Sequence, residues 1–409
     1  MKHKVRRLTI SVLIAAFVGC APPIARADNL LRFFPLLQGN FLYTDNVYLT
    51  PNNAQGDFDS NFAAGFYLDV STPKRYATLE YSTFGSLFVS HSNLDRAGQA
   101  QFFRVTDQEQ ISPQTKVNLY EWFVRDSPTL MALTSGDRLP EFTPGFTEFL
   151  LANDHVIINT FNAVAAHSYS PRWSSVFGLE QETLAPRNSG TGTMQTAHAN
   201  LLYHVNEAFA IGPGYRFIDR VYSSTAQPNS EVQWPVAYAT WLPRKDLYLD
   251  GFVGPMVAYN TTGVSRTRVD PGGVISIRYS NRRFHATVSG GQEPGLTAGL
   301  GTGGIQRFGN GEISYGLTRR VTASANAGYM DAMPAGADAR LIGYGAGLST
   351  RSTRWLTLFV RYVGLRRTYS GNFNPAVLPS HLVIGREAVA NYYVVGASVA
   401  FEAFRWSWQ

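Results

Sequence analysis

Residues 389–401 read VANYYVVGASVAF, and this stretch narrows the fold classes open to the chain. Every second residue belongs to one apolar row: Tyr393, Val395, Ala397, Val399 and Phe401. A two-residue period of this kind predicts a β-strand with one apolar face. A second aromatic set follows at once: Phe404, Trp406 and Trp408. Such a strand either closes a membrane β-barrel, with its apolar row in lipid, or ends a soluble β-sandwich.

The first 27 residues have the features of a secretion signal. Basic residues at positions 2, 4, 6 and 7 precede an apolar run from Leu8 to Cys20, and Ala25-Arg26-Ala27 forms an A-x-A cleavage site. We therefore expect residues 1–27 to be a signal peptide and residues 28–409 to form one β-barrel domain. Lipidation of Cys20, the only cysteine, is the alternative at this end of the chain.

The positive charge of the chain resides mainly in this leader. The whole sequence has 35 basic and 29 acidic residues, a formal net charge of +6. The leader holds five of the basic residues and none of the acidic ones, so the remainder carries 30 − 29 = +1. A near-neutral surface does not favour nucleic acid as a partner.

Short polar turns alternate with long connections along the rest of the chain. The eight short turns lie at about residues 71–74, 112–115, 170–172, 204–207, 243–246, 280–283, 318–320 and 350–354. Nine longer segments rich in Gly, Asn, Ser and Pro separate them: 50–60, 90–99, 126–154, 185–195, 223–232, 260–272, 294–304, 334–340 and 370–388. Together they predict an all-β, closed antiparallel transmembrane barrel of about 18 strands, with short periplasmic turns and long extracellular loops.

The strands between these connections mostly alternate between an apolar and a polar row. Along 61–70, for example, Phe62, Phe66 and Leu68 oppose Tyr67 and Asp69. Full charges in the polar rows have to face a wet interior, because an arginine on the lipid face at mid-membrane costs ~2–4 kcal/mol. Three places depart from the pattern. Pro213 and Pro255 suggest β-bulges, and residues 117–125 change phase near Glu121.

The start of the barrel region carries a short signature. The run Phe41-Leu42-Tyr43-Thr44-Asp45-Asn46-Val47-Tyr48, then Pro51 and Asp57-Phe58, resembles the opening of a family of outer-membrane β-barrel porins that often accompany exopolysaccharide-export or exosortase systems. The resemblance implies an outer-membrane location and a conduit for secreted polysaccharide. It also implies outer-membrane lipid, the barrel insertion machinery, polysaccharide and periplasmic export components as partners.

The parity of the strands assigns charged side chains to the lumen. The expected pore-lining residues are Asp69, Glu80, Arg216, Arg220, Asp250, Arg278, Glu312 and Arg361. Rings of charged side chains select ions in pores. The alternative is that these residues pair with one another and stiffen a wet interior.

The longest connection, residues 126–154, combines charged with apolar side chains. We expect it to fold into the lumen and narrow it, with Asp137, Arg138, Glu141 and Glu148 as constriction residues. The alternative is a loop packed over the barrel mouth or against a partner.

Signatures of catalysis, cofactors and metals are weak. Gly299-x-Gly301-x-x-Gly304 matches a dinucleotide-binding pattern, but no helix is expected after it, and the histidines lack metal-ligand spacing. We therefore expect a non-enzymatic channel without catalytic, cofactor-binding or metal-binding residues. A non-conducting barrel that scaffolds a secretion assembly is the main alternative. An outer-membrane hydrolase is a further one, because the fold can assemble Ser, His and Asp from distant positions.

Overall fold

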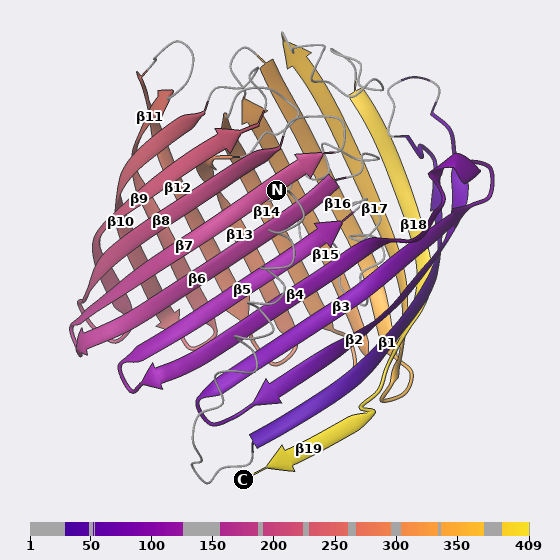
Figure 1. Ribbon diagram of the computed structural model, residues 1–409, viewed down its shortest axis with the longest axis horizontal. Coiled ribbons are helices and arrows are strands. Elements are labelled where there is room, and N and C mark those ends of the chain that lie inside the picture. The colour runs from indigo at the N-terminus through magenta and orange to yellow at the C-terminus, as the bar shows by residue number, and fades with distance from the viewer. Residues whose placement is uncertain are drawn as a thin grey trace, which may run out of the picture.

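The computed structural model describes residues 29–48, 52, 54–125, 156–186, 191–223, 229–260, 267–295, 304–333, 337–371 and 387–408. Nineteen antiparallel β-strands in these ranges pair into one sheet (Figure 1). The elements are β1 (Asn29–Thr44), β2 (Asp57–Ser71), β3 (Arg75–Phe88), the 3-10 helix η1 (Ser92–Leu94), β4 (Arg96–Ser112), β5 (Thr115–Arg125), β6 (Val156–Ser170), β7 (Trp173–Pro186), β8 (Gly192–His204), β9 (Phe209–Tyr222), β10 (Ser230–Arg244), β11 (Leu247–Asn260), β12 (Thr267–Ser280), β13 (Phe284–Pro294), β14 (Ile305–Gly316), β15 (Val321–Met333), β16 (Ala337–Arg351), β17 (Leu356–Gly371), β18 (Glu387–Ala400) and β19 (Phe404–Trp408). No helix among the described residues is long and apolar enough to cross a membrane.

The sheet closes through β1, which pairs with β2 on one side and with both β18 and β19 on the other. Leu36 to Thr44 pair with β18, and Asn29 to Phe33 pair with β19. The two last strands therefore share one position in the wall, and the barrel has 18 positions. The closed antiparallel barrel expected from the sequence is confirmed.

The connections also fall as expected. All eight short turns lie at one end of the barrel, and the other nine connections join the strands at the opposite end (Figure 1). Eight of these nine are longer than the turns, but the connection between β15 and β16 has only three residues, 334–336, and is shorter than the sequence suggested. Asparagine side chains stabilise two of the turns. Asn206 Oδ1 accepts hydrogen bonds from the backbone N–H groups of Ala208 and Phe209, both at 2.8 Å, and Asn281 Oδ1 does the same for Arg283 and Phe284. These side chains replace a backbone acceptor within the turn.

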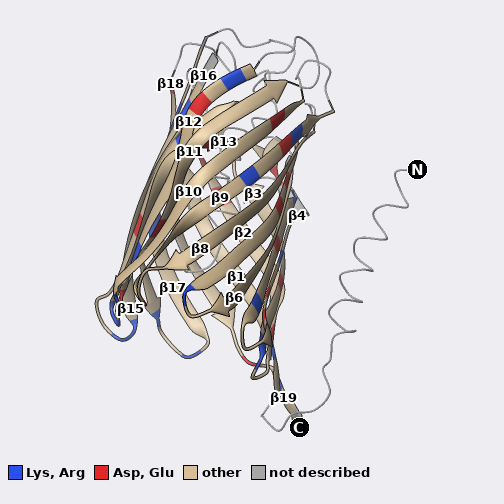
Figure 2. Cartoon of the chain, turned by 90° about the vertical axis from the view of Figure 1, so that its left-hand side faces the viewer, with Lys and Arg blue, Asp and Glu red and all other residues tan. Residues whose placement is uncertain are grey.

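Strand pairing fixes which side chains face outward. Opposite residues in an antiparallel pair share a face, so the parity can be followed around all 18 positions without a break. The outward rows contain exposed apolar side chains such as Leu179, Val253 and Val395, whereas Asp69 and Arg361 face the interior. Many of the charged residues lie in the turns and near the strand ends (Figure 2). A closed barrel leaves no backbone edge unpaired in hydrocarbon, so this apolar wall places the chain in the outer membrane.

Aromatic side chains follow one another across the outer wall of five neighbouring strands. Ring centroids are 4.8 Å apart for Phe58 and Tyr43, 6.3 Å for Tyr43 and Tyr393, 5.2 Å for Tyr393 and Tyr362, and 6.0 Å for Tyr362 and Tyr344. These contacts cross five neighbouring strands, from β2 through β1 to β16. Such aromatic pairs across neighbouring strands stabilise the membrane-facing side of the sheet.

The prolines do not form the bulges that the sequence suggested. Pairing lapses between Asn200 and Tyr203 opposite Pro213, and between Gln233 and Ala237 opposite Pro255, but it resumes in the same register each time. Proline removes a donor from the ladder. Here the sheet omits the affected hydrogen bonds and keeps its register.

The expected phase change in residues 117–125 is also wrong. Strand β5 keeps one register with β4 and β6 from Lys116 to Arg125, so Asn118, Tyr120 and Trp122 face inward. Glu121 consequently lies in the outward row. The apparent change of phase came from an acidic residue on the membrane-facing side of a regular strand.

Candidate functional site

The inner wall of the barrel is the candidate functional site, and the structure places all eight expected pore-lining residues on it. Three inward ion pairs involve four of them. Arg32 Nη2 lies 2.5 Å from Asp69 Oδ2, Arg104 pairs with Glu80, and Arg278 Nη2 lies 3.3 Å from Asp250 Oδ1. Much of the inner charge is therefore paired across neighbouring strands. Whether these pairs also select solutes stays a prediction.

Arg220 ties an extracellular connection to the wall. The Arg220 side chain is buried. Its Nε donates to Ser230 Oγ at 2.9 Å, and its Nη1 donates to the backbone oxygens of Gly304 at 2.9 Å and Gly295 at 3.4 Å. The two carbonyls belong to the residues that flank the β13–β14 connection. Arg220 on β9 therefore holds the ends of that connection on the inner side of the barrel.

Replacing Arg220 with alanine should loosen these ends. Hydrogen bonds to charged groups are worth ~1.5–3 kcal/mol, so hydrogen exchange at the Gly295 amide should accelerate by about tenfold or more. That amide now donates to Gly304 O at 3.2 Å. Exchange measured by mass spectrometry on the folded barrel tests this, with Arg278→Ala as the control for loss of an inner-wall arginine. Equal exchange in both variants would contradict the assignment.

A second group of charged residues surrounds Arg216, which is the only one of them among the expected pore-lining residues. Glu180, Glu182 and His198 face inward from β7 and β8, and Glu293 faces inward from β13. Arg216 lies within electrostatic range of Glu180 and Glu293, and its Cζ is 4.4 Å from the centroid of the Phe252 ring. The alternation along β7 could have identified the two glutamates. The approach of β13 toward β9 depends on the curvature of the barrel, which the sequence does not reveal.

Aromatic rings line the inner wall formed by β1–β5. Phe34 and Tyr67 have ring centroids 5.8 Å apart, and the hydroxyls of Tyr67 and Tyr76 are 3.2 Å apart. On β5, Tyr120 also faces inward and is 37% exposed. The ion pairs Arg32–Asp69 and Arg104–Glu80 lie on the same strands. This part of the wall presents flat apolar rings beside hydrogen-bonding groups.

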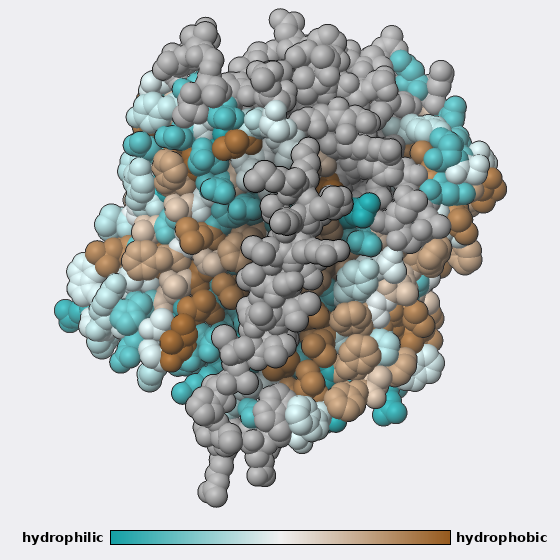
Figure 3. All heavy atoms as spheres, viewed as in Figure 1, coloured by the Kyte–Doolittle hydropathy of each residue, from teal (hydrophilic) through white to brown (hydrophobic). Residues whose placement is uncertain are grey.

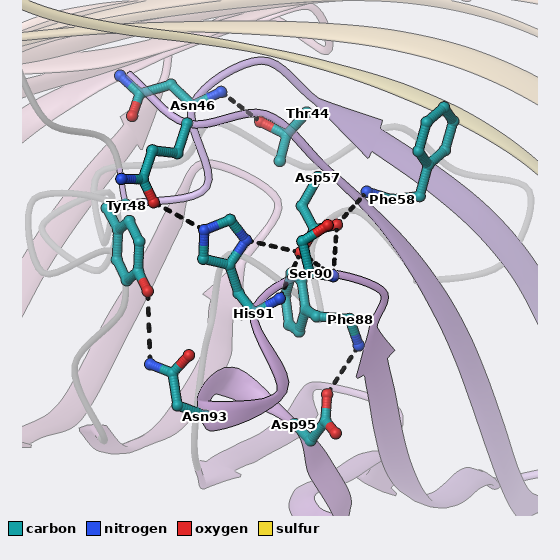
Figure 4. Close-up of polar contacts among 11 residues, drawn as sticks. Thr44, Asn46, Tyr48, Asp57, Phe58, Phe88, Ser90, His91, Asn93 and Asp95 are labelled. Atoms are coloured by element: carbon teal, nitrogen blue, oxygen red, sulfur yellow. Dashed lines mark hydrogen bonds and ion pairs between the residues drawn. The ribbon is translucent and has the colours of Figure 1, made fainter. Parts of the chain in front are cut away.

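The extracellular rim above β1–β4 is held together by one carboxylate (Figure 4). Asp57 accepts hydrogen bonds from the backbone N–H groups of Phe58, Ser90 and His91, at 2.8 to 3.1 Å, and its Oδ2 lies 2.7 Å from Nδ1 of His91. The other ring nitrogen, Nε2, lies 2.7 Å from Gln55 Oε1. Asp57 and His91 therefore connect the segment before β2 to the β3–β4 connection.

These contacts give the rim a pH dependence. Burial raises the pKa of Asp57, but the hydrogen bonds from His91, Ser90 and Phe58 outweigh it and hold the pKa below the usual 3.8. A lowered folded-state pKa means that the stabilisation is present above about pH 3.8 and is lost as the pH falls through the lower value. Exchange at the Ser90 and His91 amides, corrected for intrinsic rates, should accelerate in that acid range. Asp57→Asn should abolish this transition, and a transition that persists in the variant would refute the role of Asp57.

The expected constriction residues Asp137, Arg138, Glu141 and Glu148 lie outside the described residues. Among the residues that the structure does describe, no group of three or more His, Cys, Asp or Glu side chains is arranged to hold a metal ion.

Comparison with known proteins shows similarity only at the level of solved structures. No family model and no curated protein sequence matches the chain. Solved structures similar to it include Pseudomonas aeruginosa OccK2 (OpdF) in complex with glucuronate, at 12% identity and a TM-score of 0.44, covering 91% of this chain and 98% of that one. Acinetobacter baumannii OccAB4 has 11% identity, a TM-score of 0.43 and coverages of 93% and 100%. A BenF-like porin from Pseudomonas fluorescens Pf-5 has 14% identity, a TM-score of 0.43 and coverages of 91% and 99%. The assignment of the fold depends on the strand pairing of this chain and not on these similarities.

Proposed function

We propose that the protein is a passive outer-membrane channel for hydrophilic solutes. One observation carries this proposal: side chains on the inner face are accessible to solvent. Tyr120 faces inward from the middle of β5 and is 37% exposed, and the inward side chain of Arg278 is 58% exposed. A dry, packed core would bury such groups or leave them out.

Saccharide polymers are the solutes that the β1–β5 wall suits best. The faces of aromatic rings pack against the apolar faces of sugar rings, and the neighbouring ion pairs offer donors and acceptors to hydroxyl groups. Tyr67, Tyr76 and Tyr120 supply the rings, and Arg32–Asp69 and Arg104–Glu80 supply the polar groups. This wall supports a conduit for exported polysaccharide working with periplasmic export components.

Planar-bilayer recording of the purified, folded barrel tests both statements. Steady ohmic current steps are expected, and added oligosaccharide should block them transiently. Tyr120→Ala should shorten the blocked intervals several-fold, because stacking on one ring is lost, whereas Tyr315→Ala on the outer face serves as the matched control. Ohmic steps without any block would retain the channel and exclude the saccharide. Silence from folded protein would favour a non-conducting scaffold, and hydrolysis of phospholipid or peptide would overturn both.

A further inference from the structure

Polar side chains cross the outer face of β5–β9. A second polar row crosses the outer face of β13–β16, but there the charged groups bind one another within the chain: Arg307 Nε donates to Gln292 Oε1 at 2.7 Å, and Arg340 pairs with Asp331. Cross-strand pairing places Glu121, Gln181, Gln195 and Asp219 along one outward row that Phe161 interrupts. Gln195 Nε2 donates to Gln181 Oε1 at 3.3 Å, and Asn159 Nδ2 donates to Glu121 Oε1 at 3.2 Å. These bonds leave further donors and acceptors of the same groups facing outward.

An apolar groove lies below this polar row, on the periplasmic side. Its volume is about 600 Å³. The floor consists of small side chains and the sides of large ones, and the outward residues that line it include Ala163, Ala165, Ala197, Ala199, Phe177 and Tyr215. Phe161, which is partly exposed, stands beside the groove. The face thus carries both the projecting ring of Phe161 and a groove that is large enough to hold an aromatic ring.

Lipid is a poor neighbour for this face. Hydrocarbon offers no partner to the amides of Gln181 and Gln195 or to the carboxylate of Glu121, and unpaired polar groups in hydrocarbon are costly. Thr183 and Thr193 stand on the extracellular part of β7 and β8, so polar side chains continue above this row. In Figure 3, hydrophilic residues interrupt the hydrophobic surface on this side of the barrel. Protein covers such a surface better than acyl chains do.

We propose that β5–β9 is the contact face between two copies of this chain, related by a two-fold axis along the membrane normal near Gln181. Charge complementarity identifies the second copy as the partner. Arg125 on β5 and Asp219 on β9 lie at opposite sides of the face, and each is the eleventh residue of its strand counted from the periplasmic end. Neither forms an ion pair within the described ranges. A two-fold rotation brings Arg125 opposite the partner's Asp219, and this happens twice in one dimer.

The same rotation satisfies the remaining features of the face. Gln181 meets its own counterpart near the axis, where two side-chain amides can exchange hydrogen bonds. Phe161 on β6 meets the β8 side of the other copy at the level of Gln195, above the groove. Self-complementarity of this kind is what an isologous dimer interface requires. The contact requires no conducting pore, so it is independent of the proposed channel.

Cysteine crosslinking in native membranes tests the geometry. With Cys20→Ser as background, Gln181→Cys should form a disulfide-linked dimer under mild oxidation. Val395→Cys, on the opposite wall and also outward, should remain monomeric and is the matched control. Equal crosslinking at both positions would indicate random collision and would overturn the proposal. A folded Gln181→Cys barrel that stays monomeric, or links to another protein, would also overturn it.

Charge exchange provides a second test that does not depend on one thiol. Arg125→Asp and Asp219→Arg should each weaken the dimer by at least tenfold in native mass spectrometry or analytical ultracentrifugation of the detergent-solubilised barrel. The double exchange should restore it, because the two charges still face each other. Restoration is not expected if either change merely perturbs folding. A wild-type barrel that carries only bound lipid and no second copy would refute the dimer.

Discussion

Replacing Trp234 with alanine should lower the free energy of unfolding by about 3–5 kcal/mol, the range for loss of a buried tryptophan from a packed core. Trp234 faces inward on β10 and is 0% exposed. It packs against Met256 and lies edge-on to Phe252, with ring centroids 5.1 Å apart, and its Nε1 donates to Gly254 O at 3.1 Å. Truncation leaves a cavity where the wall turns between β9 and β11. Denaturant unfolding in detergent micelles or lipid bilayers would measure the loss.

Two further variants separate the contribution of the hydrogen bond from that of packing to this loss of stability. Trp234→Phe keeps most of the ring and removes the hydrogen bond to Gly254, so it should cost about 1 kcal/mol. Trp241→Ala removes the same side chain from an outward position where it is half exposed, and it should cost clearly less than Trp234→Ala. A Trp234→Ala barrel as stable as the Trp241→Ala barrel would show that the inner side of this wall is not packed.

Placing an arginine at Val395 should destabilise the inserted barrel by about 2–4 kcal/mol, the cost of a lipid-facing arginine near the midplane. Val395 lies midway along β18, pairs with Phe41 and Val360 in the outward row, and is 58% exposed. The cost arises because the guanidinium has no water or partner there. Reversible folding into lipid bilayers, compared with the unmodified chain, would measure it.

The depth of the substitution is the control. Val389→Arg lies in the same outward row but six residues nearer the extracellular end of β18, so its cost should fall to about 0–1 kcal/mol. Equal charge costs at the two depths would mean that this wall does not face hydrocarbon.

The fold was accessible from the sequence because its signals are local. Side chains of a barrel strand alternate strictly between lipid and interior, so rows such as Phe62, Phe66 and Leu68 reveal the outward face without any tertiary information. Short turns have their own chemistry, as the Asn206 and Asn281 side chains show. Counting the alternating segments and the short turns gives the number of strands and shows at which end of the barrel each connection lies.

The inner wall was only partly accessible because its contacts join distant strands. Parity placed Arg216 and Arg220 inside, but it could not show that Arg220 reaches the carbonyls of Gly295 and Gly304, some 75 to 84 residues away along the chain. Sequence reasoning also assumes a uniform lipid surface. Glu121 therefore looked like an irregularity of β5, whereas the strand is regular and the surface around it is not uniform.

The closure of the barrel between β1 and the two last strands, β18 and β19, has a consequence for its assembly. Its hydrogen bonds join residues from opposite ends of the coding order, as in the pairs of Asn29 with Trp408 and Tyr43 with Tyr393. Until the final segment has left the ribosome and reached the envelope, the first strand has a row of unmatched amides that lipid cannot accommodate. The edge of β1 therefore stays unpaired until β18 and β19 reach it, so closure of the cylinder in lipid requires both of these strands.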